Sequence, residues 1–188
     1  MMRGKEEENE IFIYRYQMRY NMSTMVRILP MDKITEFKNM ASDKVQSEFF
    51  LKEMPSRIKK TIHGTYQGIY CFKSNKIKTD SLDTYILFQY DNHIIACAKL
   101  EEKHNCNEHI EYKGFYVLPP KDIVTFNKIN LNDLNTYVFP NDPIKRFSQV
   151  CHKRTLVDIS EFLNNPIVTN KDYVEKDLIP EYNFQCQP

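Results

Sequence analysis

The sequence predicts an α+β domain, with a small, curved, mostly antiparallel sheet or barrel and short helices beside it. The strongest sign is a pair of apolar runs, residues 82–90 and 94–98, on either side of the polar turn Asp91-Asn92-His93. Two such runs joined by a short polar turn are typical of a β-hairpin. The chain is also 13% aromatic, with isoleucine, valine and leucine in short runs. Apolar residues recur at helical spacing only in short stretches.

These patterns divide the 188 residues into three parts. Residues 1–25 hold a charged N-terminal tail and an arm in which aromatic and basic residues alternate. Residues 26–165 form the single domain, and residues 166–188 form an acidic C-terminal tail. Exposed aromatic residues are enriched at protein interfaces, so the arm is a candidate site for a protein partner.

The first half of the domain begins with a strand over residues 26–29. A helix is expected over residues 42–53, because Ser42 can cap it, apolar residues follow at helical spacing, and Pro55 ends the pattern. A second short helix over residues 56–61 and a strand over residues 66–73 lead to the hairpin.

The second half alternates between strands and short helices. Pro119 and Pro120 separate two strands, and residues 155–158 resemble a capping box ahead of the last helix. In chain order the expected elements are strands over residues 110–118 and 123–126, a helix from Asn130 or Asn132, a helix over residues 144–152, and a helix ending at Asn164.

Composition excludes several classes of protein. The four glycines are dispersed, which argues against a glycine-rich phosphate loop. The sequence has no run of 18 apolar residues and no signal-peptide pattern, so we expect a cytoplasmic protein without a membrane partner. The five cysteines are odd in number and irregularly spaced, which favours free thiols.

The net charge of +1 hides a strong asymmetry. Residues 54–79 and residues 143–157 contain basic residues but no Asp or Glu. If the two segments share a face, they form a positive patch suited to phosphates. The candidate phosphate contacts are Arg57, Lys59, Lys60, Lys76, Lys78 and Arg146.

Tyrosines flank the first basic segment in the expected strands. Their rings provide surfaces on which bases can stack, and their hydroxyls can form hydrogen bonds. Packing in the core or the hairpin is the alternative role for each ring. The candidate base-stacking residues are Tyr66, Tyr70, Tyr85 and Tyr90.

The order of the expected elements resembles the centre of PUA-like domains, the superfamily that includes PUA, ASCH, EVE and YTH modules. The resemblance is carried by a helix, a strand, a basic turn with Asp80, the strand over residues 85–90, a short turn and the small-residue strand over residues 94–98. Residues 113–120 and 123–126 are similar to the returning strands of those domains.

The resemblance covers residues 42–163 and implies nucleic-acid binding, in some members with a base turned out into an aromatic pocket. This chain departs from the individual families. It has no Trp for a YTH-type cage, and it lacks the Lys-Ser-Glu-Pro signature of EVE domains and the Gly-x-Lys-x-x-Glu-x-Arg signature of ASCH domains. The subfamily and the ligand therefore stay open.

Two patterns bring metal chemistry into consideration. His104, Cys106 and His109 have the side chains and spacing of zinc ligands, but a fourth ligand is missing, so a solvated loop is the expectation. Asp83 or Asp91, followed by Glu101 and Lys103, imitates a metal-dependent nuclease. Such short charge patterns also arise by chance.

We therefore expect a nucleic-acid-binding domain that recognises a modified or extruded base, without catalytic residues, bound metal or cofactor. The choice between DNA and RNA is open. One alternative is a protein-interaction factor of a phage or mobile element that acts on a host complex, and another is a metal-dependent nuclease.

Overall fold

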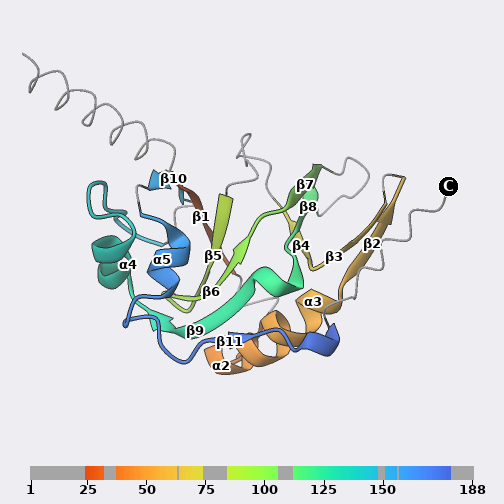
Figure 1. Cartoon of the computed structure of the whole chain (residues 1–188), viewed down its shortest axis with the longest axis horizontal. Coiled ribbons are helices and arrows are strands. Elements are labelled where there is room, and N and C mark those ends of the chain that lie inside the picture. Colours follow the sequence, from red (N-terminus) through yellow and green to blue (C-terminus); the bar gives the residue numbers. More distant parts are fainter. Residues whose placement is uncertain are drawn as a thin grey trace, which may run out of the picture.

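A computed structural model describes residues 24–31, 37–62, 64–73, 84–105, 112–147, 151–155 and 157–178. The described chain forms an α+β fold in which a six-stranded sheet separates short helices on one side from a second, smaller sheet on the other (Figure 1). A longer helix runs across the bottom of both sheets in the view of Figure 1.

The main sheet has the strand order β10-β1-β5-β6-β9-β11. Only the β1–β5 pairing is parallel, and the others are antiparallel. The bounds are β1 (Thr24–Pro30), β5 (Thr84–Tyr90), β6 (His93–Lys99), β9 (Ile123–Ile129), β10 (Cys151–Thr155) and β11 (Asp172–Tyr173). In the described part of the chain β10 and β11 are the two edges of an open sheet, so the predicted barrel is not seen there.

The predicted hairpin is confirmed as β5 and β6, with Tyr90 paired to His93. Its two turn residues, Asp91 and Asn92, have φ angles of 48° and 61°. Positive φ at both positions defines the type I′ turn, whose twist matches that of the strands, and Asn and Asp tolerate this conformation better than most residues. The turn therefore forms without the glycine that usually specifies it.

Each face of the main sheet packs against a separate hydrophobic core. One core lies under α4 (Leu131–Tyr137) and α5 (Ile159–Leu163). The other lies under a continuous helix made of α2 (Ser42–Lys44), a π-helical middle, η1 (Val45–Glu53), and α3 (Met54–Ser56). The side chain of Asn130, one of the two residues from which the sequence predicts a helix, caps α4 by accepting from the Asp133 amide.

The second sheet packs on the face of the main sheet that the long helix also covers. It has the order β4-β8-β7, with bounds β4 (Ile69–Phe72), β8 (Gly114–Val117) and β7 (Glu102–Asn105). Its Tyr70, Phe72 and Tyr116 contribute to the core. The buried Arg27 of β1 lies with its guanidinium 5.1 Å from the centre of the Tyr116 ring, which joins the two sheets.

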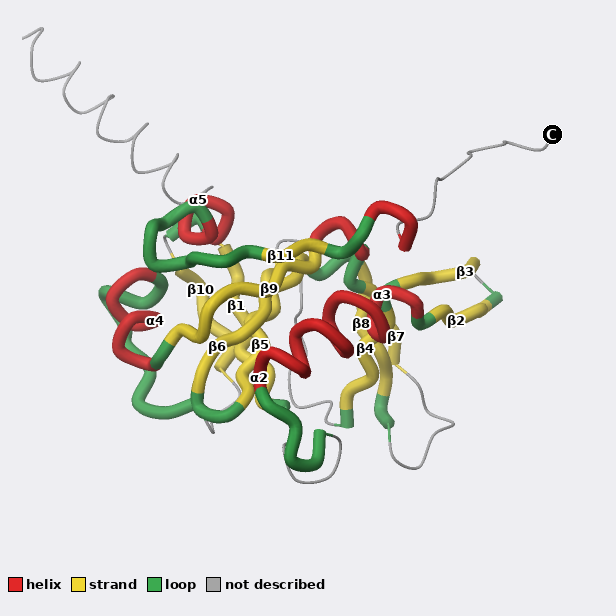
Figure 2. The backbone as a smooth tube through the Cα atoms, turned by 90° about the horizontal axis from the view of Figure 1, so that it is seen from below, coloured by secondary structure: helices red, strands yellow, loops and turns green. Residues whose placement is uncertain are grey.

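A separate two-stranded ribbon, β2 (Ile58–Thr61) and β3 (Gly64–Gln67), precedes the second sheet. The helix predicted for residues 56–61 is therefore wrong. The chain leaves the long helix at Arg57, whose backbone is extended, and no apolar stripe follows that could hold a helix against the body. Figure 2 shows the ribbon extending from the end of the molecule opposite α4.

Two other expectations need correction. The helix predicted for residues 144–152 is absent from residues 144–147, because the Asn135 side chain bonds both backbone groups of Ile144, and residues 151–155 form β10. The predicted tail, residues 166–188, is described to residue 178, and this part is built into the domain. There β11 pairs with β9, and Val168 and Val174 are buried. The remaining helices are short 3₁₀ turns, η2 (Pro120–Asp122) and η3 (Lys176–Leu178).

A bulge in the centre of the main sheet is closed by a side chain from the long helix. The pairing of β6 shifts register at Ile95 against both neighbouring strands. The side-chain amide of Gln46 donates to the Ile95 carbonyl at 2.8 Å and to the Phe126 carbonyl of β9 at 2.6 Å. The amide therefore satisfies two carbonyls beside the interrupted ladder and fixes the helix to the sheet.

We predict that Gln46→Met lowers the free energy of unfolding by about 2 kcal/mol or more, because methionine keeps the volume and leaves two carbonyls without their donor. Urea unfolding followed by circular dichroism measures the change. Ser47→Ala, at the exposed neighbouring position, is the matched control and should stay within about 0.5 kcal/mol of wild type. Equal stability of the Met variant and wild type would show that the amide is dispensable.

Candidate nucleic-acid interface

The β2–β3 ribbon carries exposed cations on both of its faces. Its register pairs Lys59 with Tyr66 and Lys60 with Thr65. Adjacent residues in a strand point to opposite faces, so Lys59 shares a face with Tyr66, and Lys60 shares the other with Thr65. Both lysines are exposed. From Arg57 to Lys73 the sequence holds no Asp or Glu, so the ribbon itself contains no carboxylate that could neutralise them.

The base of the ribbon is fixed by Gly68. Its amide donates to the Arg57 carbonyl at 3.1 Å, and its carbonyl accepts from the Leu118 amide at 2.9 Å. Gly68 has a φ of 72°, and a Cβ there would lie 1.9 Å from the Leu118 carbonyl oxygen. Only glycine fits both the left-handed backbone and this close approach, so a single residue sets the angle between the ribbon and the second sheet.

Aromatic contacts attach one ribbon face to the second sheet. The Tyr66 ring lies 4.6 Å from the His104 ring, which stacks on Phe115 at 4.7 Å with an interplanar angle of 14°. The His104 Nε2 lies 2.8 Å from a carboxylate oxygen of Glu102. Tyr66 is half-buried, so it keeps part of its ring at the surface beside Lys59.

Arg57 has a different environment from the lysines. Its guanidinium forms an ion pair of 2.6 Å with Glu53 and lies 5.0 Å from the centre of the Phe49 ring. The carboxylate compensates part of its charge. Arg57 therefore helps to hold the ribbon to the long helix. Because its charge is partly compensated, it would attract a phosphate less strongly than the two lysines would.

The other predicted tyrosines lie away from the ribbon surface. Tyr70 and Tyr90 are buried in the core under the long helix, and the Tyr90 hydroxyl lies 2.8 Å from the Met40 carbonyl oxygen. Tyr70 packs 5.3 Å from Phe88, ring centre to ring centre. Tyr85 is half-buried on the opposite face of the main sheet, against the core under α4 and α5. Of these four tyrosines, Tyr66 is the one that lies on the ribbon, where it shares a face with Lys59.

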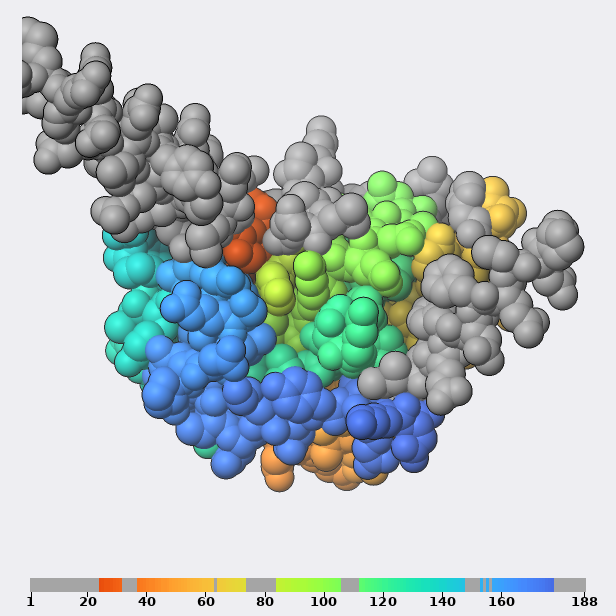
Figure 3. Space-filling model, in the orientation of Figure 1, coloured from red at the N-terminus to blue at the C-terminus, as the bar shows by residue number. Residues whose placement is uncertain are grey.

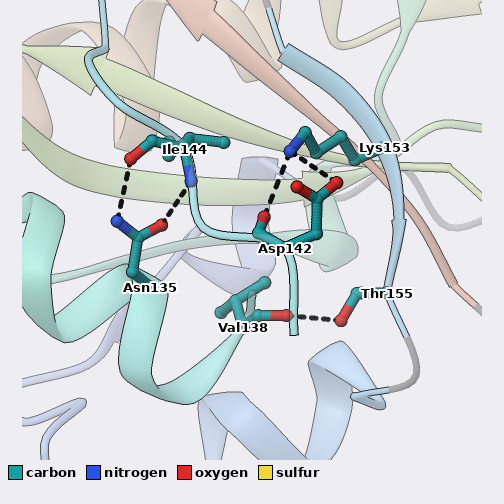
Figure 4. A network of polar contacts seen from close by, with 6 residues as sticks. All are labelled: Asn135, Val138, Asp142, Ile144, Lys153 and Thr155. Atoms are coloured by element: carbon teal, nitrogen blue, oxygen red, sulfur yellow. Dashed lines mark hydrogen bonds and ion pairs between the residues drawn. The ribbon is translucent and has the colours of Figure 1, made fainter. Parts of the chain in front are cut away.

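In the described part of the chain, the second basic segment does not join the ribbon lysines. Arg146 is exposed in the segment after α4. Figure 4 shows how this segment is fastened: Asn135 bonds both backbone groups of Ile144, and Lys153 of β10 forms an ion pair with Asp142 at 2.7 Å. Figures 1 and 3 place α4 and the chain that follows it at the end opposite the ribbon. Lys76 and Lys78 lie outside the described residues.

The described residues give little support to metal chemistry. Among them no three His, Cys, Asp or Glu side chains gather as metal ligands, while Cys106, His109 and Asp83 fall outside them. Asp91 and Glu101 lie beyond opposite ends of β6, too far apart to share a metal ion. The expected solvated loop at His104, Cys106 and His109 and the alternative of a metal-dependent nuclease therefore stay untested.

Two further observations concern sequence predictions. Cys97 is fully buried in β6, and burial raises the pKa of its thiol, so it is an unreactive packing residue. No helix in the described ranges is long and apolar enough to cross a membrane. The aromatic arm, within residues 1–25, lies almost entirely outside those ranges.

Sequence reasoning missed the pairing of Glu102 with His104 and the contact of the His104 ring with Tyr66. The alternation of Glu102, Lys103 and His104 could have indicated a strand with Glu and His on one face. The partner strand, however, is known only from the register of β7 with β8.

Comparisons with protein families, curated proteins and solved structures give no match to this chain.

We predict that Gly68→Ala destabilises the domain more than Gly64→Ala. Alanine at position 64 suffers only backbone strain, about 1 to 3 kcal/mol, because nothing lies within 4 Å of the added Cβ. Alanine at position 68 has similar strain and also meets the Leu118 carbonyl. Thermal and urea unfolding of both variants measure the difference, and equal losses would contradict the role given to Gly68.

We also predict that Tyr70→Ala lowers the free energy of unfolding by about 3 to 5 kcal/mol, the usual cost of removing a buried aromatic ring. Tyr66→Ala should cost clearly less, since Tyr66 is half-buried. Differential scanning calorimetry compares the two. A Tyr70 variant as stable as wild type would place that ring at the surface and restore it as a base-stacking candidate.

Proposed function

We propose that this protein binds nucleic acid through the β2–β3 ribbon. The observation that carries the proposal is a ribbon, made only of its own two strands, that presents exposed lysines on both faces and contains no carboxylate. A two-stranded β-ribbon is one of the two elements that fit a DNA major groove. Lysines on both faces would meet phosphates on both sides of such a groove.

The electrostatics of the ribbon suit a polyanion. Exposed lysines that neutralise phosphates release condensed counterions, and this release drives association. Two carboxylates whose partners contact or adjoin the ribbon are engaged locally, Glu53 with Arg57 and Glu102 with His104. These pairings reduce the repulsion that unpaired carboxylates would exert on incoming phosphates.

Tyr66 supplies the aromatic part of the proposed interface. Its ring lies on the same ribbon face as Lys59, and the His104–Phe115 stack supports it from behind. A nucleotide whose phosphate contacts Lys59 would bring its sugar or base against this ring. Stacking of one base on an aromatic side chain contributes about 1 to 3 kcal/mol.

The resemblance to PUA-like domains agrees with nucleic-acid binding, although the proposal does not depend on it. Recognition of a modified or extruded base also belongs to the proposal, with Tyr66 as the stacking residue kept from the four tyrosines that the sequence suggests. The competing role, a protein-interaction factor, rests on the N-terminal aromatic arm, and a metal-dependent nuclease rests on acidic residues that include Asp83. Both depend on parts of the chain outside the described residues.

We predict that the double substitution Lys59→Glu and Lys60→Glu weakens nucleic-acid binding at least about tenfold and lowers the slope of log affinity against log salt by about 2, one for each lost phosphate contact. Fluorescence anisotropy measures both quantities, with labelled single- and double-stranded DNA and RNA titrated across a salt series.

The matched control is Lys145→Glu with Arg146→Glu, which makes the same change in net charge at the opposite end of the molecule. It should alter affinity much less. Equal losses in the two variants would show a response to overall charge and would contradict a site on the ribbon. Failure of the wild-type chain to bind any of the four nucleic acids would reject the proposed function.

A further inference from the structure

The tip of the ribbon carries an apolar side chain in an unusual place. The last residue pair of the ribbon is Thr61 with Gly64, so Ile62 begins the loop that joins the two strands. Its side chain is 95% exposed, the largest exposure among the exposed large hydrophobic residues in the described ranges. Hairpin loops favour Gly, Asn, Asp, Ser and Pro, because these residues suit tight turns or hydrogen-bond their own backbone. Isoleucine has neither property.

From this position, and resting on the proposed function, we propose that the ribbon enters a groove of double-stranded DNA and that Ile62 inserts between base pairs as a wedge. Side chains such as isoleucine are used in this way by proteins that partly unstack a base step and kink the duplex. The proposal names the ligand as duplex DNA and the consequence of binding as a bend.

The dimensions of the ribbon suit this role. From Ile58 in its first residue pair to Ile62 in the loop, the ribbon extends about 13 Å, because a strand rises about 3.3 Å per residue. The grooves of B-DNA are about 7.5 to 8.5 Å deep, so the loop reaches the base edges before the body of the protein meets the backbone. Lys60 and Lys59 lie two and three residues behind Ile62, about 7 to 10 Å along the strand, a distance comparable to the depth of the groove.

The distribution of side chains within the ribbon also suits entry into a groove with the tip toward the bases. The lysines on opposite faces would contact the two backbones that border the groove, while Ile62, beyond the last residue pair, would lie nearest the bases. The ribbon base is held by Gly68, Arg57 and Tyr66, whose contacts are described above. A tip held on a fixed base can transmit force to a stacked base step, whereas an untethered loop would fold away from it.

Duplex DNA is favoured over duplex RNA for a geometric reason. The major groove of A-form RNA is deep and too narrow for protein side chains, and its minor groove is shallow. A ribbon two strands wide matches the B-form major groove, which is about 12 Å across. Entry from the minor groove requires that groove to widen, and a kink produced by a wedge does this.

The test uses the full-length chain and two duplexes of 30 base pairs, one fully paired and one with a central mismatch. Donor and acceptor dyes at the two ends report bending by energy transfer, and anisotropy reports affinity. We expect wild type to raise energy transfer and to prefer the mismatched duplex by about tenfold to hundredfold, because the mismatch has already lost much of the stacking that a wedge must break.

Ile62→Ala should abolish both the bend and the mismatch preference, while it keeps the salt dependence that the lysines provide. Ile58→Ala is the matched control, because Ile58 is 61% exposed on the same ribbon but lies at its base. It should behave as wild type does.

The outcomes separate the two proposals. Salt-dependent binding to duplex DNA without a bend, or bending by Ile62→Ala equal to that of wild type, overturns the wedge and leaves the proposed function standing. Preference for single strands or for RNA overturns duplex DNA as the ligand in the same way. Absence of binding to every nucleic acid rejects both proposals and directs attention to a protein surface that would cover Ile62.

Discussion

The fold depends on how the chain satisfies backbone carbonyl groups where the hydrogen-bond ladder is interrupted in the middle of its largest sheet. At Ile95 the central strand β6 changes register against both of its neighbours, and a buried interruption of this kind would leave carbonyl groups without donors. The Gln46 amide supplies the donors from the long helix. Helix and sheet are thereby held in one relative position, and the chain that follows the helix leaves from a defined point. The ribbon, Gly68 and the second sheet are all placed by that exit.

The sequence predicts the parts of this structure whose signals are local. The β5–β6 hairpin and the cap of α4 by Asn130 follow from turn and capping chemistry, which acts over a few residues. The ribbon was missed because residues 58–61 read Ile-Lys-Lys-Thr, a pattern too short to distinguish a strand from a helix. The failed helix over residues 144–152 has another cause: the Asn135 side chain holds Ile144 in a non-helical turn, and such a contact is not visible in the sequence.

In the candidate site, too, the sequence predicts some features and misses others. Charge can be read from the sequence, so the lysines of the ribbon were found. The position of a residue in the fold cannot be read in this way. Arg146 was therefore grouped with the ribbon lysines, although it follows α4, and Figure 1 shows α4 at the end opposite the ribbon. Tyr70 and Tyr90 were assigned to a surface although they lie in the core. An aromatic residue in a strand has the same local pattern whether it faces a core or a ligand. Only the register of β2 with β3 and the packing of the second sheet distinguish Tyr66 from the others.

The position of β1 also has a consequence for how the chain folds during synthesis. β1 lies between β5 and β10, so the first described strand is completed on one side by residues 84–90 and on the other by residues 151–155. Contacts so distant in sequence close large loops and form slowly. Until β10 has emerged from the ribosome, one edge of β1 stays unpaired, and an exposed edge of this kind invites pairing with other chains. The domain therefore reaches its protected state only when nearly all of its residues have been made.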